Sequence, residues 1–277
     1  MGLGTFGIYT FDFEHQPPAL MRESVQELEE QGWQSFWFPE VGGREAFSQA
    51  GLLLAATERI TVVNGIAQVT ARTPAAAHGG ATLLTEAYPD RYLLGLGIGP
   101  GRPGTKPLEL MTSYLDELDS FENPTRRILA AYGPKMLALA RDRAIGAHTY
   151  HVTVAHTAQA RETLGQDTFL GVEHAVLFES DPDKARAIAR EHLHVYLNTP
   201  FNIAKFRRLG YAEDEIAGGG NDRIVDDLVF WGDPDAIVTR LREHVEAGAD
   251  HVAIQVIGIE QGQSAMPYWR KLGEALL

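Results

Sequence analysis

One stretch of the sequence, residues 59–104, constrains the fold more than any other. Two short apolar segments, residues 60–63 and 92–98, are separated by an amphipathic helical pattern. This order predicts a β-α-β unit with parallel strands. Each segment ends in residues that favour turns: Asn64, Gly65 and Ile66 after the first, and Gly99, Pro100 and Gly101 after the second. Glycine at a strand exit permits a positive φ and close approach of a ligand to the backbone. Ligands bind at the C-terminal strand ends of parallel α/β folds, so these exits, together with Gly97, predict a site for a flat and sizeable ligand.

Strand-like segments recur along the whole chain and alternate with helical patterns. Eight are expected, at residues 5–11, 35–38, 60–63, 92–98, 127–131, 149–154, 172–178 and 251–257. Strands that alternate with helices form a parallel sheet, and eight such units in 277 residues fit an α/β fold of the (β/α)8 TIM-barrel type. We therefore predict a single barrel domain over residues 1–277.

The interval between the seventh and eighth predicted strands is unusually long. Helical patterns at residues 183–197, 203–209 and 234–247 predict extra helices between strands 7 and 8. The glycine-rich segment 218–222 lies among them and predicts a hinge or loop. The interval could form a lid over the barrel mouth or pack as ordinary outer helices.

The composition limits the classes of partner. A net charge of −13 disfavours nucleic acid and anionic membranes, and it means that an anionic ligand needs a local binding device. The chain has no cysteine, which removes disulfides, thiolate nucleophiles and cysteine metal sites. Neither a secretory signal pattern nor a membrane-spanning apolar segment is recognised, so we predict a cytoplasmic protein with a small-molecule substrate.

A local anion-binding device is expected where the apolar run 127–131 meets a helix. The turn and the first helical positions are Tyr132, Gly133, Pro134, Lys135 and Met136. Proline suits the first position of a helix, and the free N–H groups there, with the positive end of the helix dipole, would hold a phosphate. The lysine adds a mobile positive charge. The alternative is a Gly-Pro pair that does no more than start a helix.

Glu40 follows the second predicted strand directly and is therefore expected at the ligand-binding rim. A carboxylate at that position could donate or accept a proton near a reacting ring. A loop carboxylate or a helix cap is the alternative interpretation. Asp12, Glu14 and His15 hold the corresponding rim position after the first strand and are weaker candidates.

Other chemistries have less support in the sequence. Residues 97–101 match a dinucleotide fingerprint poorly, because prolines delay the helix and the strand is fourth in order. His148, His151 and His156 lie in a run expected to be strand-rich, where their side chains would not all point to the same face. No acidic residue completes a familiar metal-binding spacing, so we predict no metal site. No Gly-x-Ser-x-Gly elbow supports a hydrolase. His174, His244 and His251 are interpreted as core or surface residues.

Several motifs, taken together in their order and spacing, resemble those of the luciferase-like monooxygenase family across nearly the whole chain. They are residues 32–40, 59–66, 72–74, 94–99, 133–136 and 231–234. Within that family the chain is most similar to the branch that uses the deazaflavin coenzyme F420.

The resemblance implies a barrel that binds the flavin-like ring at the C-terminal strand ends. It further implies a non-prolyl cis peptide at Gly65–Ile66 backing the ring, a cofactor phosphate on the Gly133 turn, and Glu40 near the reacting ring. The implied cofactor-binding residues are Asn64, Gly65, Ile66, Gly97, Gly99, Tyr132, Gly133, Pro134, Lys135 and Met136. The segment 118–124 is short beside many relatives, which implies a more open substrate pocket, and the family commonly forms homodimers.

The resemblance thus implies an F420-dependent oxidoreductase that transfers a hydride between deazaflavin and an organic substrate, with Glu40 as the proton partner. This chemistry needs neither a thiol nor a metal. An FMN-dependent monooxygenase is the alternative among enzymes. A catalytically idle flavin-binding protein, and a cofactor-free barrel for a phosphorylated metabolite, also remain open.

Overall fold

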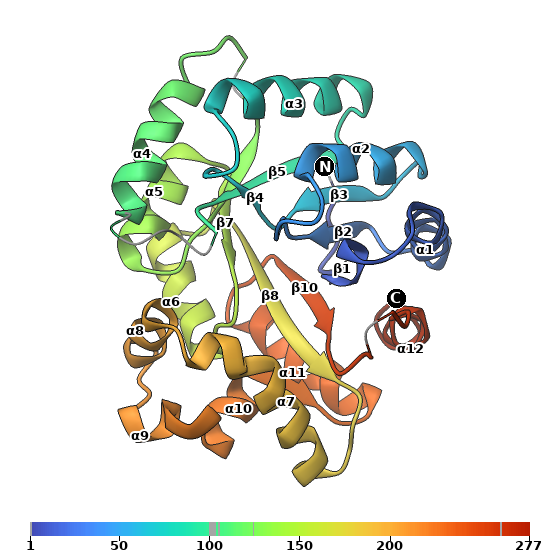
Figure 1. Ribbon diagram of the computed structural model, residues 1–277, viewed down its shortest axis with the longest axis vertical. Coiled ribbons are helices and arrows are strands. Elements are labelled where there is room, and N and C mark those ends of the chain that lie inside the picture. The colour runs from blue at the N-terminus through green and yellow to red at the C-terminus, as the bar shows by residue number, and fades with distance from the viewer. Residues whose placement is uncertain (1, 100–103, 105, 124, 261) are drawn as a thin grey trace.

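Eight parallel strands form a closed barrel in the computed structural model of the chain, which describes residues 2–99, 104, 106–123, 125–260 and 262–277 (Figure 1). The barrel strands are β1 (Phe6–Tyr9), β2 (Ser35–Phe38), β3 (Thr61–Asn64), β5 (Tyr92–Gly97), β6 (Arg127–Ala130), β7 (Gly146–Thr149), β8 (Phe169–Leu177) and β10 (His251–Val256). They pair in this order, and β10 pairs with both β8 and β1, which closes the barrel. The predicted (β/α)8 fold is therefore confirmed. Pro100 and Gly101, which belong to the predicted second strand exit, lie outside the described residues.

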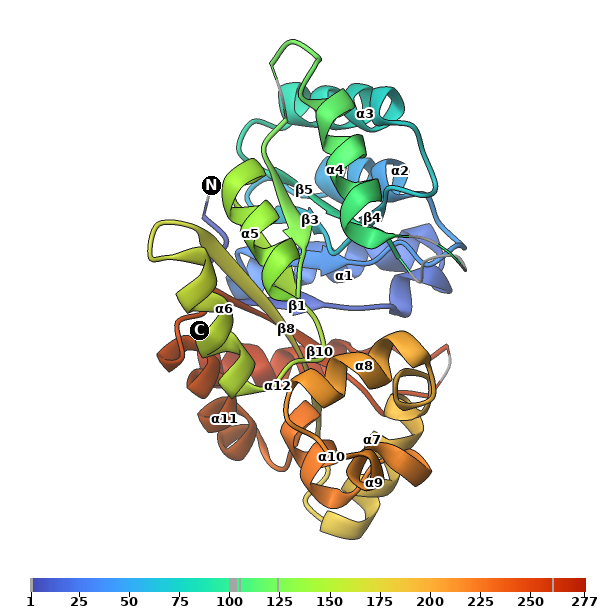
Figure 2. The same ribbon diagram turned by 90° about the vertical axis from the view of Figure 1, so that its left-hand side faces the viewer.

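Helices surround the barrel strands (Figures 1 and 2). Those outside the interval between β8 and β10 are the 3-10 helix η1 (Asp12–Glu14), α1 (Pro18–Gln31), α2 (Ala46–Ala55), α3 (Pro74–Ala87), α4 (Pro107–Leu118), α5 (Pro134–Arg143), α6 (Val154–Leu164) and α12 (Met266–Leu276). Local chemistry sets their ends: α1 begins at Pro18 and stops at Gly32, which has a φ of 103°. Among the described residues, no helix is both long and apolar enough to cross a bilayer.

The sixth predicted strand is displaced along the chain. We predicted a strand over residues 149–154, whereas β7 ends at Thr149, Thr153 caps α6, and α6 begins at Val154. Gly146 and Ala147 are poor strand formers by propensity, but they pair with both β6 and β8. A Cβ atom at Gly146 would lie 2.0 Å from the carbonyl oxygen of Phe169, so glycine is what permits the close pairing.

The predicted extra helices between the seventh and eighth barrel strands are present. The interval holds α7 (Pro182–Leu197), α8 (Pro200–Arg208), α9 (Glu213–Ile216), the 3-10 helix η2 (Ala217–Gly219), α10 (Asp222–Leu228), the short strand β9 (Val229–Trp231) and α11 (Pro234–Glu246). Side chains from α7 to α10 form their own apolar cluster with the end of β8. The glycine-rich segment is a compact turn in which Gly218, Gly219 and Gly220 have positive φ and Asn221 caps α10. Sequence analysis missed β9 and the two-residue strand β4 (Ala67–Gln68), which are too short to produce a pattern.

Aromatic side chains fill the inside of the barrel. Trp37 stacks on His148 with ring centroids 4.9 Å apart and on His251 at 5.2 Å, and Tyr9 stacks on His148 at 6.1 Å. Burial lowers the pKa of His148 to about 3 and that of His251 to about 4, so both imidazoles are neutral at neutral pH. Packed rings thus fill the barrel interior, so a ligand site is expected at the strand ends.

Candidate active site

The exit of β3 is built around the peptide bond between Gly65 and Ile66, which is cis, as the resemblance implies. The carbonyl oxygen of Gly65 accepts a hydrogen bond of 2.6 Å from the Tyr9 hydroxyl. The Gly65 N–H donates to the carbonyl of Phe38 at 2.8 Å, and the Glu40 N–H donates to the carbonyl of Ile66 at 3.0 Å. This exit is therefore fixed by the ends of β1 and β2.

The glycines at the exit of β5 make room for neighbouring parts of the chain. A Cβ atom at Gly97 would lie 2.5 Å from Ile66 Cγ1 and 3.0 Å from Ala130 Cβ. Gly99 has a φ of +70°, and a Cβ atom there would lie 2.5 Å from the side-chain oxygen of Gln68. The exits of β3, β5 and β6 consequently meet around Gly97, and we call Gly65, Ile66, Gly97 and Ala130 the strand-exit platform.

Asn64 supports this platform from within the protein. Its side chain is buried; its oxygen accepts a 2.5 Å hydrogen bond from the Tyr92 hydroxyl, and its amide nitrogen donates to the carbonyl of Ala46 at 3.3 Å. Both polar atoms thus have protein partners. A contact of the Asn64 side chain with cofactor stays a prediction.

The predicted anion-binding turn has the expected local structure. β6 ends at Ala130, Gly133 is the N-cap of α5, and Pro134 occupies the first helical turn. No side chain among the described residues caps this helix, and a Cβ atom at Gly133 would meet no atom within 4 Å. Lys135 is exposed there. The open helix end and its adjacent cation fit the requirements of a phosphate.

Tyr132, just before this turn, connects it to neighbouring helices. Its carbonyl oxygen lies 2.9 Å from Nε2 of His156, and the imidazole stacks on the tyrosine ring with centroids 5.3 Å apart. Arg208 and Lys205 of α8 both lie over the same ring, at 5.5 and 5.6 Å from its centroid. Basic side chains therefore gather on this side of the molecule, although the chain as a whole is acidic.

Glu40 lies at the rim, as predicted, and its carboxylate already has several donors. Arg72 forms a two-pronged ion pair with it, with Nη1 2.8 Å from Oε2 and Nη2 bonded to Oε1. The N–H of Gln68 donates to Oε2 at 2.7 Å, and the N–H of Ala46 donates to Oε1 at 3.3 Å. Glu40 therefore joins the exit of β2 to β4 and to the start of α2, beside Ile66. Its proton role stays a prediction.

A second group of polar side chains, four of them buried and three half-buried, lies beside Tyr9 and was missed by sequence analysis. It comes from β8, β10, the loop after β7, and the helices α7 and α8, and we call it the polar cluster: Glu173, Gln255, Tyr150, His151, His192, Tyr196 and Lys205. The available signal was the pair Glu173 and His174 inside the otherwise apolar run of β8.

The three histidines considered as metal ligands occupy different kinds of element. His148 lies on β7, His151 follows it with a positive φ of 49°, and His156 lies on α6, so the expectation of one strand-rich run was wrong. Among the described residues, no three histidine, aspartate or glutamate side chains gather closely enough to hold a metal ion.

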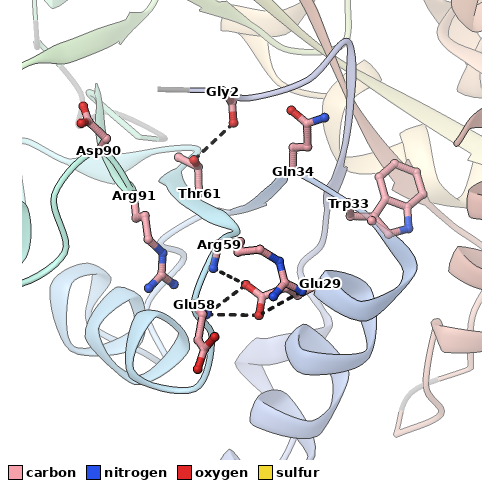
Figure 3. Close-up of a pocket in the computed structure, with 10 residues that line it drawn as sticks. Gly2, Glu29, Trp33, Gln34, Glu58, Arg59, Thr61, Asp90 and Arg91 are labelled. Atoms are coloured by element: carbon pink, nitrogen blue, oxygen red, sulfur yellow. Dashed lines mark hydrogen bonds and ion pairs between the residues drawn. The ribbon is translucent and has the colours of Figure 1, made fainter.

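A hollow of about 500 Å³ opens at the opposite end of the barrel (Figure 3). Glu29 lines this hollow, and its carboxylate accepts hydrogen bonds from the backbone N–H groups of Glu58, Arg59 and Ile60. This hollow lies at the N-terminal ends of the strands, where barrel residues serve stability, so we place the functional site at the other end.

Comparisons with known proteins show which proteins the chain is similar to. Residues 5–108 match the family of luciferase-like monooxygenases. A putative coenzyme F420-dependent oxidoreductase of Mycobacterium tuberculosis is 23% identical, and the alignment covers 89% of this chain and 93% of that protein.

Solved structures show the same fold. An F420-dependent secondary alcohol dehydrogenase in complex with an F420–acetone adduct superposes with a TM-score of 0.72 at 15% identity, covering 91% of this chain and 93% of the other. The FMN-bound oxygenating constituent of 3,6-diketocamphane monooxygenase from Pseudomonas putida superposes with a TM-score of 0.66 at 14% identity, covering 97% and 95%. The predicted resemblance to luciferase-like proteins, and to F420-dependent oxidoreductases among them, is confirmed.

Proposed function

We propose that this luciferase-like barrel is an F420-dependent oxidoreductase that transfers a hydride between the deazaflavin ring and an organic substrate. One observation carries the proposal: the strand-exit platform lies at the ends of β3, β5 and β6, and the chain continues from β6 into the open N-terminus of α5. The match to a putative F420-dependent oxidoreductase over most of both chains favours this branch. The bound deazaflavin would supply the two-electron chemistry, and the protein would supply orientation and an anion site.

The chain's residues would hold the cofactor in two places. Ile66 and Gly97 would face the ring, since they meet at the exits of β3 and β5. Gly133, Pro134 and Lys135 would hold the phosphate through backbone N–H groups and a positive charge. Asn64, Gly99, Tyr132 and Met136 would border these two parts. The two parts together would suit a ligand that is flat at one end and anionic at the other.

Glu40 keeps its proposed proton role, but its neighbours define how it would act. Its carboxylate is held by Arg72 and by the backbone N–H groups of Gln68 and Ala46, so its position at the rim is fixed. The same contacts fix the backbone of Glu40 against Ile66. We therefore propose that Glu40 both positions the platform and accepts a proton from the reacting pair.

FMN is the alternative cofactor, because it also has a tricyclic ring and a phosphate, and an FMN-bound monooxygenase shares the fold. A catalytically idle flavin-binding protein would bind cofactor without turnover. We further propose one domain over residues 1–277, a homodimer and a cytoplasmic location, which limited proteolysis, size-exclusion chromatography and cell fractionation, respectively, can check.

Side-by-side titration with F420 and FMN, followed by fluorescence, tests the cofactor. Tighter binding of F420 is expected, and tighter binding of FMN, or binding of neither, would refute the proposal. Gly133→Glu should weaken F420 binding by at least roughly tenfold, because it adds a carboxylate at the phosphate position. Gly133→Ala, which enters open space, and Gly79→Glu, which places the same charge on exposed α3, are the matched controls.

Turnover separates the enzyme from an idle binder. A protein that retains F420 but exchanges no hydride with any alcohol or carbonyl compound in a broad panel would be a binder. Glu40→Gln should leave binding within a few-fold and slow turnover. Wild-type rates at every pH would remove the proton role from Glu40.

A further inference from the structure

The polar cluster brings together a buried carboxyl group, a buried amine and the hydroxyls of two half-buried tyrosines. Glu173 on β8 has no exposed surface, and Lys205 on α8 is 4% exposed. Lys205 Nζ donates to the carbonyl of Tyr150 at 3.0 Å, and the hydroxyls of Tyr150 and Tyr196 lie 2.8 Å apart. Figure 1 shows α7 beside the end of β8. The helices α7 and α8 contribute His192, Tyr196 and Lys205 to the cluster.

Several buried polar atoms of the cluster have no hydrogen-bond partner among the described residues. They are Oε1 of Glu173, both ring nitrogens of His151 and Nε2 of His192. The second oxygen of Glu173 has one long contact, 3.4 Å from the N–H of His151. Buried polar groups are normally paired, and leaving several unpaired in one region costs free energy. Such a set indicates a place for a polar ligand group.

The charges in the cluster favour a neutral ligand. Burial raises the pKa of the Glu173 carboxyl to about 8, and burial lowers the pKa of the Lys205 ammonium to about 7. The groups that face Glu173 are Tyr9 on β1, Tyr150 and His151 after β7, Tyr196 on α7 and Lys205 on α8. Both shifts favour the neutral forms of the two groups, so the cluster offers little charge to hold an ion, and burying an unpaired ion costs several kcal/mol.

We propose that the polar cluster binds the hydroxyl or carbonyl group of the organic substrate, that the substrate is an uncharged alcohol, ketone or aldehyde, and that Glu173 donates a hydrogen bond to it. The inference rests on the proposed oxidoreductase function and adds the substrate class and its binding residues. A protonated carboxyl and neutral imidazoles can each donate and accept, which matches a group that does both. Aromatic rings would contact the apolar part of the substrate. The ring centroids of Tyr9 and Tyr150 lie 6.0 Å apart, and those of Phe11 and Tyr150 lie 6.4 Å apart.

Tyr9 places this cluster next to the proposed ring site. Its hydroxyl donates to the carbonyl of Gly65 in the strand-exit platform, and its ring contacts Tyr150 in the cluster. One side chain thus borders both regions. A substrate held by Glu173 and Tyr196 would be brought to the side of the platform on which Tyr9 lies.

Ligand-observed NMR on the cofactor-free protein tests the inference directly. The probes are propan-2-ol, cyclohexanol and cyclohexanone, with cyclohexanecarboxylate and cyclohexylammonium as charged counterparts. We expect the neutral probes to bind at least roughly tenfold more tightly than the charged ones. Failure of every neutral probe to bind, or equal binding of the charged probes, would overturn it.

Variants identify the groups that bind. Glu173→Gln keeps a donor and should retain the affinity within a few-fold, whereas Glu173→Leu should lower it roughly tenfold. The leucine variant should unfold at the same or a higher temperature, because it removes a buried polar group without a full set of partners. Equal probe affinity in the wild type and the leucine variant would contradict the role of Glu173.

A second pair of variants does not depend on Glu173. Tyr196→Phe should weaken probe binding, whereas Tyr211→Phe, which removes a hydroxyl bonded to Asp227 outside the cluster, should not. Equal effects of the two would refute the assignment. Because the probes are tested without cofactor, a failed F420 titration with intact probe binding would refute the oxidoreductase proposal alone.

Discussion

Replacing Arg72 by methionine is expected to destabilise the protein more than replacing its partner Glu40 by glutamine. The side chains of Arg72 and Glu40 are 8% and 7% exposed, so their ion pair is almost fully removed from water. Arg72→Met leaves the Glu40 carboxylate with two backbone N–H donors and no cation. Glu40→Gln leaves Arg72 with Glu45 at 3.1 Å and the carbonyl of Gln68 at 3.0 Å. The two halves of the pair are therefore unequally supported.

The magnitudes follow from that inequality. Removing one partner of a buried pair costs about 3–5 kcal/mol, and we take about 3 kcal/mol for Arg72→Met because two amides still solvate the carboxylate. Glu40→Gln retains an acceptor oxygen and should cost about 1–2 kcal/mol. For a chain of this size the larger loss corresponds to a fall of roughly 6–10 °C in Tm.

Thermal and urea unfolding followed by circular dichroism measure both losses. Arg59→Met is the control, because Arg59 is 67% exposed and lies 3.8 Å from Glu29, so its loss should cost less than about 0.5 kcal/mol. A cost below about 1 kcal/mol for Arg72→Met, or a larger cost for Glu40→Gln, would refute the reasoning. Arg72→Met should also weaken F420 binding, since Glu40 holds Ile66 in place.

Three further outcomes are expected. Burial lowers the pKa of His148 and His244 to about 3 and that of His251 to about 4, so these histidines take up protons when the chain unfolds. As the pH falls from about 6.5 toward 4, each of them therefore lowers the free energy of unfolding by roughly 1.4 kcal/mol per pH unit. Glu173 changes the stability in the opposite direction, because burial raises its pKa in the folded protein. The test therefore compares the wild type with His148→Leu in urea unfolding at several pH values. The same dependence of unfolding free energy on pH in both proteins would contradict a neutral buried His148. Tyr9→Phe leaves the carbonyl of Gly65 without its hydroxyl donor and should cost about 1–3 kcal/mol in chemical unfolding, with no loss arguing against that hydrogen bond. Gly97→Ala should cost about 1–3 kcal/mol and weaken F420 binding, because its methyl group would overlap Ile66 and Ala130; calorimetry and titration measure the two effects, and a fully tolerated alanine would contradict the packing.

The barrel could be predicted from the sequence because its strands are short apolar runs between recognisable helix signals. β2 lies at the predicted residues, and the starts of α1 and α7 follow from prolines that the sequence displays. β7 was misplaced because Gly146 and Ala147 lack strand propensity, and pairing with strands on both sides decides their conformation. Local pattern therefore suffices where propensity and tertiary contacts agree, and it fails where the contacts override propensity.

Side-chain roles at the site depend on contacts between distant residues, which local patterns do not contain. Glu40 was placed at the rim from its position after a strand, but its pairing with Arg72 across 32 positions of the chain follows from how the β3 and β4 region folds back. Glu173 was overlooked because strands of a closed barrel are buried on both faces, so alternation along β8 does not say which residues face inward.

The glycines of the strand exits have a structural reason that the sequence interpretation did not contain. They were interpreted as sites where a ligand approaches the backbone, whereas in the structure Gly97 makes room for Ile66, and Gly99 makes room for Gln68. The same absence of side chains lets two loops close over the ends of β3, β5 and β6 and form the platform itself. A ligand would then meet the assembled surface rather than a single glycine, so Gly97→Ala should disturb the fold and the proposed cofactor site together, while Gly133→Glu, whose side chain enters open space, should affect binding alone.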